Sequence, residues 1–282
     1  MTDKNDSEFG ISRRSALMKI GGTAGSAALV GLTSTPAAAM KRPVHRKWAR
    51  QAAEQVKSQR GNGHILVDAI AENADEPDEN KYKCSDTIRE YECDKYENCG
   101  ERICQLLEEA NQPYTHYRNP ERAEWAGGLG MAHSKAKAKA KKARDEATDS
   151  NTNWSYVAEM TARSIHYIQD VGTLVHAGKG ATQIANTDIH FDWEEEVINN
   201  WDSYFNKGVS DANGSYDGIE SASEVKAYTD IVAGNSHDAL HNNWGDLKDP
   251  GDYNHSTWSA QRDCIRSATQ TIHGTIDWIY NG

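Results

Sequence analysis

Five side chains that can bind metals, within residues 166–194, constrain the fold of this chain more than any other feature. His166 and Asp170 are four residues apart, and so are His190 and Glu194. Residues four apart on an α-helix face the same way, separated by about 40° of rotation and about 6 Å of rise. Each pair would then offer an imidazole nitrogen and a carboxylate oxygen to one ion, and zinc accepts both ligand types. The spacing therefore predicts two helices that carry metal ligands.

A further histidine, His176, follows Asp170 by six residues. On a straight helix this spacing would turn His176 to the far side. Gly172 offers a place for the helix to end or bend. We therefore expect His176 to serve a different ion together with the second His/Glu pair, which makes at least two metals.

Most of the remaining chain has a helical pattern. Helices are predicted over residues 48–59, 63–74, 97–112, 134–147 and 256–280. In the last of these, one apolar stripe contains Ile265, Ala268, Ile272, Ile276 and Ile279, and Ser256 or Ser259 is the expected cap. The lysine-rich segment 134–147 has no apolar residue larger than alanine and is expected to be a solvated helix. No strand pattern stands out, so we expect one all-α, multi-helix domain over residues 40–282.

The first 39 residues have the layout of a twin-arginine export signal. Arg13 and Arg14 precede a weakly apolar run of small residues, and an Ala37-x-Ala39 pattern follows. The other interpretation, a membrane anchor, is disfavoured because the run is shorter than the ~20 residues that span a bilayer. We expect a secreted, monomeric protein.

Net charge and cysteine content limit which binding partners and which cellular compartment we expect for this chain. A net charge of -11 and a mean hydropathy of -0.80 describe a polar, soluble chain with no general attraction for nucleic acid or anionic lipid. An anionic substrate would need a local positive charge, such as a bound metal.

Four of the five cysteines lie within residues 80–104, and their uneven spacing favours disulfides over a cysteine zinc site. These are Cys84, Cys93, Cys99 and Cys104, which leaves Cys264 over.

The full string His-x3-Asp-x5-His-x13-His-x3-Glu resembles the zinc-dependent phospholipase C family, all-helical secreted bacterial enzymes with three zinc ions in one cleft. HYIQDVGTLVHA is similar to a family motif, except that Leu174 stands where proline is usual. Upstream, NGHILV places His64 like the family's first-helix histidine. THYRNP places His116 where the family has an aspartate, followed by Tyr117, and MAHS adds His133. The segment 80–104 looks like an insertion.

The resemblance implies two to three zinc ions and a ligand set for each. The first set is His116, His133, His166 and Asp170; the second is His176, His190 and Glu194. The third is His64 with Trp48, provided that the mature chain begins at Trp48, and Asp170 would bridge to the first. The other interpretation of Trp48 is an apolar anchor of its helix. His116 and Asp170 would be catalytic, and Tyr117 would contact substrate.

The function implied by the resemblance is that of an exported phospholipase C. It would cleave the glycerol–phosphate bond of phospholipids with a metal-activated water, touching a membrane surface transiently. Zinc-dependent single-strand nucleases share this fold but typically use His-x3-Asp at the last pair, so Glu194 and the thirteen-residue gap favour the phospholipase. The third possibility is a zinc-stabilised surface protein without activity.

Five other histidines have weaker contexts. His237 and His241 are four residues apart but lack a carboxylate-rich partner motif, so we interpret them as surface residues or residues behind the metal ligands. No motif surrounds His45, His255 or His273.

Overall fold

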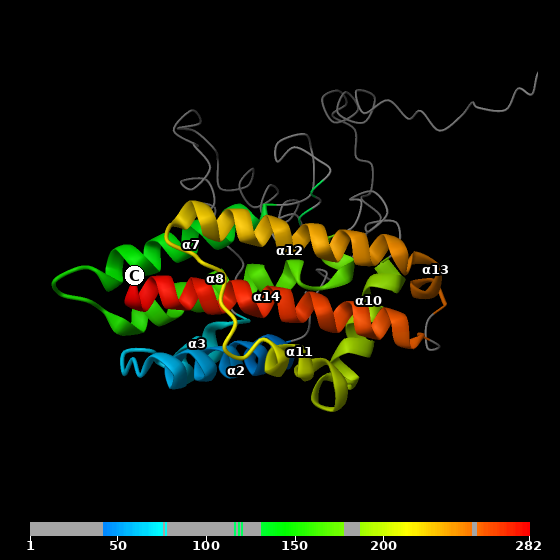
Figure 1. The fold of residues 1–282 in the computed structure, drawn as a ribbon, viewed down its shortest axis with the longest axis horizontal. Helices are drawn as coiled ribbons and strands as arrows, with labels where there is room; N and C mark the ends of the chain where they lie inside the picture. Colours follow the sequence, from blue (N-terminus) through cyan, green and yellow to red (C-terminus); the bar gives the residue numbers. More distant parts are fainter. Residues whose placement is uncertain are drawn as a thin grey trace, which may run out of the picture. The chain divides into compact units, whose positions relative to one another are not determined.

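The computed structural model describes residues 42–75, 77, 116, 118, 120, 131–177, 187–249 and 253–282. Within these ranges every regular element is helical, which confirms the all-α expectation (Figure 1). The elements are α2 (Arg42–Arg60), α3 (Val67–Asn73), α7 (Ala132–Ala147), α8 (Trp154–Val171), the 3-10 turn η2 (Leu174–His176), α10 (Thr187–Asn199), the π-helical turn η3 (Trp201–Phe205), α11 (Asn206–Asp211), α12 (Ala222–Asn242), α13 (Trp244–Leu247) and α14 (His255–Asn281).

The C-terminal helix α14 is the element around which the others pack. It contacts α2, α7, α8, α11 and α12, and Figure 1 shows α12 along one of its sides and α2 with α11 along another. The predicted stripe from Ile265 to Ile279 is fully buried. The cap differs from the prediction: the Asn254 side chain accepts a hydrogen bond from the Thr257 amide at 3.1 Å, so the helix begins just before Ser256.

Helix α7 corrects the prediction of a solvated lysine-rich helix. Ala136, Ala140 and Ala143 are fully buried, and α7 packs against both α8 and α12. The Ser164 hydroxyl donates to the Ala136 carbonyl at 2.8 Å. Methyl groups as small as alanine's allow two helix backbones to approach closely. One face of the segment is therefore buried, Lys135 included, while Lys141 and Asp145 on the other side are exposed.

The end of α8 determines where the metal-capable residues lie. The helix starts at the Asn153 cap and stops at Gly172, as expected for a break between Asp170 and His176. A Cβ atom on Gly172 would lie 2.7 Å from the Ala268 Cβ and 3.1 Å from the Trp48 ring. Only glycine fits this close approach of α8 to α14 and α2.

Replacing Gly172 with alanine should lower the free energy of unfolding by about 1–3 kcal/mol, because the added methyl overfills a packed interior. Urea unfolding of the pure protein measures this. Gly234→Ala in α12 is the matched control, since a Cβ there meets nothing within 4 Å and alanine is the better helix former. Equal stability of Gly172→Ala and the parent would contradict the close packing.

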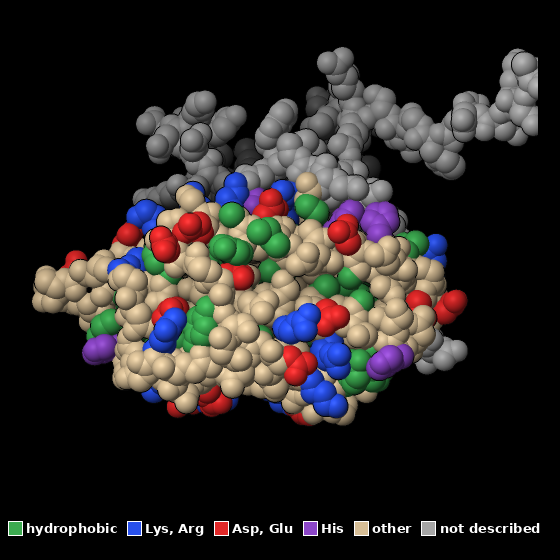
Figure 2. Space-filling view, viewed as in Figure 1, with side chains coloured by type: hydrophobic (Ala, Val, Ile, Leu, Met, Phe, Trp, Pro, Cys, Tyr) green, Lys and Arg blue, Asp and Glu red, His purple; other side chains and the backbone are tan. Residues whose placement is uncertain are grey.

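Figure 2 shows one face of the protein, over α2, α11, α12 and α14. Acidic and basic side chains are interspersed on it. The part of this face that the structure describes therefore shows no continuous basic patch.

Several predictions concern residues outside the described ranges. These are the leader 1–39, the helix 97–112, the four clustered cysteines and Tyr117. Cys264 lies on α14, buried and free, and burial raises the pKa of its thiol to about 12. None of the helices in the described ranges is long and apolar enough to cross a membrane.

Candidate metal centre

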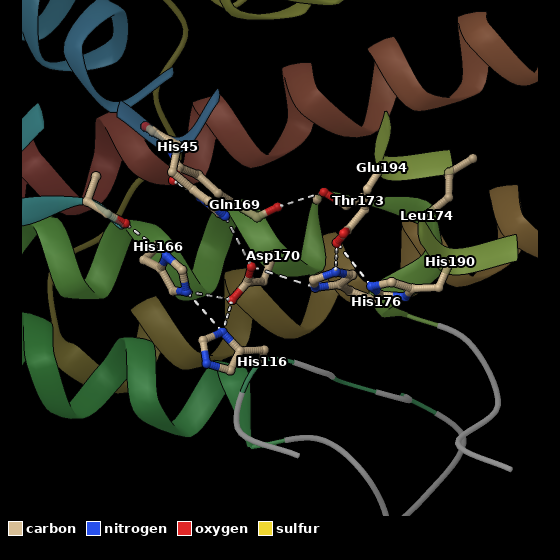
Figure 3. Close-up of polar contacts among 12 residues, drawn as sticks. His45, His116, His166, Gln169, Asp170, Thr173, Leu174, His176, His190 and Glu194 are labelled. Carbon is tan, nitrogen blue, oxygen red and sulfur yellow. Dashed lines mark hydrogen bonds and ion pairs between the residues drawn. The ribbon is translucent and has the colours of Figure 1, made fainter. Parts of the chain in front are cut away.

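Helix α8 presents His166 and Asp170 on one face, as predicted. The His166 Nε2 lies 3.1 Å from the Asp170 Oδ2, and both side chains are fully buried. His116 joins them from the preceding part of the chain, with its Nδ1 2.7 Å from the same carboxylate oxygen and 2.9 Å from the His166 Nε2 (Figure 3). The predicted neighbours His116, His166 and Asp170 therefore meet at one point.

The other oxygen of Asp170, Oδ1, faces two further histidines. It lies 3.6 Å from the His45 Nε2 and 3.6 Å from the His176 Nδ1. No hydrogen-bond donor within the described ranges reaches Oδ1, although the atom is buried. A buried carboxylate oxygen without a donor is costly, and a cation would remove that cost. Asp170 therefore faces histidines on both of its oxygens.

A second set of ligand atoms meets around Glu194. Its Oε1 lies 2.9 Å from the His176 Nε2 and 3.0 Å from the His190 Nε2. His190 and Glu194 are one turn apart on α10, and the rings of His176 and His190 stack with centroids 4.9 Å apart. His176 therefore lies with the second His/Glu pair, where the break at Gly172 allows it to turn.

Two groups thus bring ligand atoms within 4.8 Å of one another: His45, His166 and Asp170 form the first group, and His176, His190 and Glu194 the second. For zinc–ligand bonds of about 2.0–2.1 Å, ligand atoms around a tetrahedral ion are about 3.3 Å apart. The distances from carboxylate oxygens to imidazole nitrogens are of this size, 3.1 and 3.6 Å in the first group and 2.9 and 3.0 Å in the second, and the donors are the nitrogen and oxygen types that zinc binds. The residues present therefore fit zinc.

Hydrogen bonds behind the ligands fix the orientation of two imidazoles. The His166 Nδ1 lies 2.8 Å from the Ala74 carbonyl, which can only accept. The His45 Nδ1 lies 2.6 Å from the Gln169 Oε1, while the Gln169 amide nitrogen donates to the His45 carbonyl. Each ring therefore carries a proton on Nδ1 and directs its Nε2 toward the Asp170 carboxylate. This is the usual arrangement behind metal-bound histidines.

Both carboxylates are held in the ionised form that metals require. Burial would raise the pKa of the Asp170 carboxyl, but His166 and His116 outweigh it and lower that pKa well below its usual value. Burial likewise opposes ionisation of Glu194, whose pKa is nevertheless lowered by His190 and by the hydrogen bond from His176.

His45 is the residue that sequence motifs missed. It lies in the first turn of α2, fully buried, and its ring packs 4.4 Å from that of His166. One sequence feature could have indicated it: His45 precedes Trp48 by three residues, and residues three apart share a helix face. A histidine one turn before a core tryptophan also faces the core.

The structure places Trp48 away from the ligand atoms. Its indole is fully buried, packs 5.6 Å from the Trp201 ring, and donates to the Thr269 hydroxyl at 2.8 Å. This is the apolar anchor that was the other interpretation of Trp48. The α2 residue at the Asp170 carboxylate is His45 instead.

The assignment of His64 as a ligand is corrected by its position. His64 is exposed and stacks on Trp154 with centroids 4.2 Å apart. Trp154 is twelve residues before His166 on α8, a distance of about 18 Å along the helix. The implied third zinc site, His64 with Trp48, is therefore not brought together.

The remaining histidines lie outside both groups. His133 is buried on α7, but its ring nitrogens are not among the ligand atoms that meet in either group. His237 is buried on α12 with its ring 4.8 Å from that of His241. His273 lies beside the Ser215 carbonyl and Gln55, and His255 is exposed.

Comparison with known proteins adds a similarity of fold. No family model and no curated protein matches the chain. Among solved structures, the alpha toxin from Clostridium absonum is similar, with a TM-score of 0.47 and 12% identity over 86% of this chain. The chain spans 64% of the length of that structure. The likeness concerns the arrangement of helices.

Proposed function

We propose that the protein is an exported, zinc-dependent phosphodiester hydrolase that acts as a phospholipase C. The observation that carries the proposal is the pair of buried ligand groups joined by Asp170, whose two oxygens face His166 and His176. Neighbouring zinc ions held this way suit phosphodiester hydrolysis, in which charge builds on the attacking and the leaving oxygen.

The charge of the loaded site favours a phosphodiester substrate. Each group contains one carboxylate, Asp170 or Glu194, and otherwise imidazoles. Two divalent ions would exceed the charge of these two carboxylates, so the site would be positive within a chain of net charge -11. A phosphodiester anion would be attracted to this point of the protein.

Bound zinc supplies an acidified water and neutralises the phosphoryl oxygens. The chain's own residues do the positioning. His116 is held by its Nδ1 against Asp170, and in Figure 3 its other ring nitrogen points away from that carboxylate. We assign His116 the role of taking a proton from the attacking water, and Asp170 the role of holding its imidazole. Tyr117 is proposed to contact the lipid head group.

The proposal of a lipid substrate rests on the ligand spacing. Glu194, at the position where the similar nucleases typically have aspartate, favours phospholipid over single-stranded nucleic acid. The twin-arginine layout of residues 1–39 supports export. We further propose that the mature chain is a monomer and touches a membrane surface transiently. The two ligand groups support two zinc ions per chain.

A comparison of substrates tests the proposal. The zinc-loaded exported chain is incubated with phosphatidylcholine vesicles and, separately, with single-stranded DNA. We expect release of diacylglycerol and phosphocholine, loss of this activity with a chelator, and its return with zinc. Hydrolysis of DNA but not of lipid would replace the proposal with a nuclease. Zinc binding with turnover of neither substrate would indicate a structural metal.

A further inference from the structure

A buried glutamine on α14 touches all three elements that join the two ligand groups. Gln261 is fully buried. Its amide nitrogen donates to the Gly172 carbonyl at 2.8 Å. Its amide oxygen accepts from the Leu174 backbone N–H at 3.1 Å and from the Trp193 indole N–H at 2.9 Å.

Each of these contacts lies next to metal-capable residues. Gly172 ends α8, two residues after Asp170. Leu174 begins the 3-10 turn that ends in His176. Trp193 precedes Glu194 on α10. One side chain thus fixes the position of α8, η2 and α10 relative to one another.

The contact with Leu174 explains a departure of the sequence from the motif it resembles. Leu174 stands where proline is usual, and proline has no N–H to donate. With leucine here, a fully buried backbone N–H needs an acceptor, and the Gln261 amide oxygen supplies it. The Leu174 and Gln261 positions therefore depend on each other.

We propose that Gln261 is a positioning residue for the metal centre: it sets the distance between Asp170 on α8 and the second group, His176, His190 and Glu194. This inference rests on the proposed zinc centre. Gln261 does not touch the ligand atoms. It holds the turn between Asp170 and His176 and the helix that carries His190 and Glu194.

Zinc affinity, measured by competition with a chromogenic chelator, tests the proposal. Gln261→Met keeps the side-chain length but leaves two buried N–H groups without an acceptor. We expect one of the two zinc ions to bind about 10- to 100-fold more weakly, the range found when groups behind metal ligands are replaced.

Two further variants separate positioning from general loss of stability. Thr271→Val removes another side-chain hydrogen bond of α14, the partly buried one from the Thr271 hydroxyl to Asp217 at 2.6 Å, and should leave zinc affinity unchanged. Leu174→Pro removes the N–H that Gln261 satisfies. Thr173, at φ -103° and ψ 128°, already has the conformation preferred before proline. Adding Leu174→Pro to Gln261→Met should therefore recover part of the lost zinc affinity.

The outcomes distinguish this inference from the zinc centre itself. If the parent protein binds no zinc, the proposed function fails. If the parent binds two ions and Gln261→Met binds both as tightly, the positioning role is overturned while the centre stands. A loss of zinc affinity in Thr271→Val equal to that in Gln261→Met, at matched stability, would also overturn it.

Discussion

Asp170→Asn should abolish hydrolysis and weaken zinc binding at both groups. The Asp170 oxygens face His116 and His166 on one side and His45 and His176 on the other. An asparagine has the same shape but no charge, and its amide nitrogen cannot ligate a cation. Asp170 is itself a ligand in the first group, whereas in the second group it stands behind the Nδ1 of His176, whose Nε2 faces Glu194. Replacing groups behind metal ligands costs up to about 100-fold in affinity, so we expect a loss of about that size at the second group and at least that much at the first.

Zinc content after dialysis and chelator competition measure the effect. Asp145→Asn is the matched control, because Asp145 is an exposed aspartate on α7 that pairs with Lys141 at 2.5 Å; this variant should keep full zinc content. If Asp170→Asn retained both ions at parental affinity, Asp170 would not bridge the two groups.

His45→Ala should remove zinc from the first group and most of the activity. His45 reaches Asp170 from α2 and is oriented by Gln169, so its loss leaves that group one ligand short. We expect zinc affinity to fall by at least about 10-fold. His255→Ala, on the exposed first turn of α14, is the control and should match the parent.

His45 also bears on where the mature chain begins, for which the family resemblance implied Trp48. Cleavage immediately before Trp48 would remove His45, whereas cleavage after Ala39 keeps it. N-terminal sequencing of the secreted, active enzyme should therefore find a chain that still contains His45. Full activity in a chain that begins at Trp48 would exclude His45 as a ligand.

Local spacing was sufficient to predict the parts of the site that lie on single helices. The His166/Asp170 and His190/Glu194 pairs follow from helix periodicity alone, and Gly172 indicated the break that frees His176. These residues are separated by short stretches of chain, so the helix geometry leaves few alternatives for where they point.

The contributions of distant elements could not be predicted in this way. His45 reaches the site because α2 packs beside α8, a tertiary contact without a local signature. The first-helix histidine was assigned to His64, which follows the 19-residue helix α2 at the end opposite His45. Such a helix is about 28 Å long, so one end can reach the Asp170 carboxylate and the other cannot.

The burial of one face of α7 could not be predicted from the sequence for a related reason. Alanines at helical spacing do not indicate either burial or exposure, and the lysines between them favoured the prediction that the helix is exposed to solvent. The packing of α7 between α8 and α12 depends on the small size of Ala136 and Ala140, which composition alone does not reveal.

Anomalous diffraction at the zinc edge, from crystals of the zinc-loaded protein, tests the central claim most directly. We predict two peaks: one within ligand distance of His45, His166 and Asp170, and one within ligand distance of His176, His190 and Glu194. The absence of zinc from these positions, or zinc bound only elsewhere in the protein, would contradict the metal centre and the phosphodiesterase proposed from it.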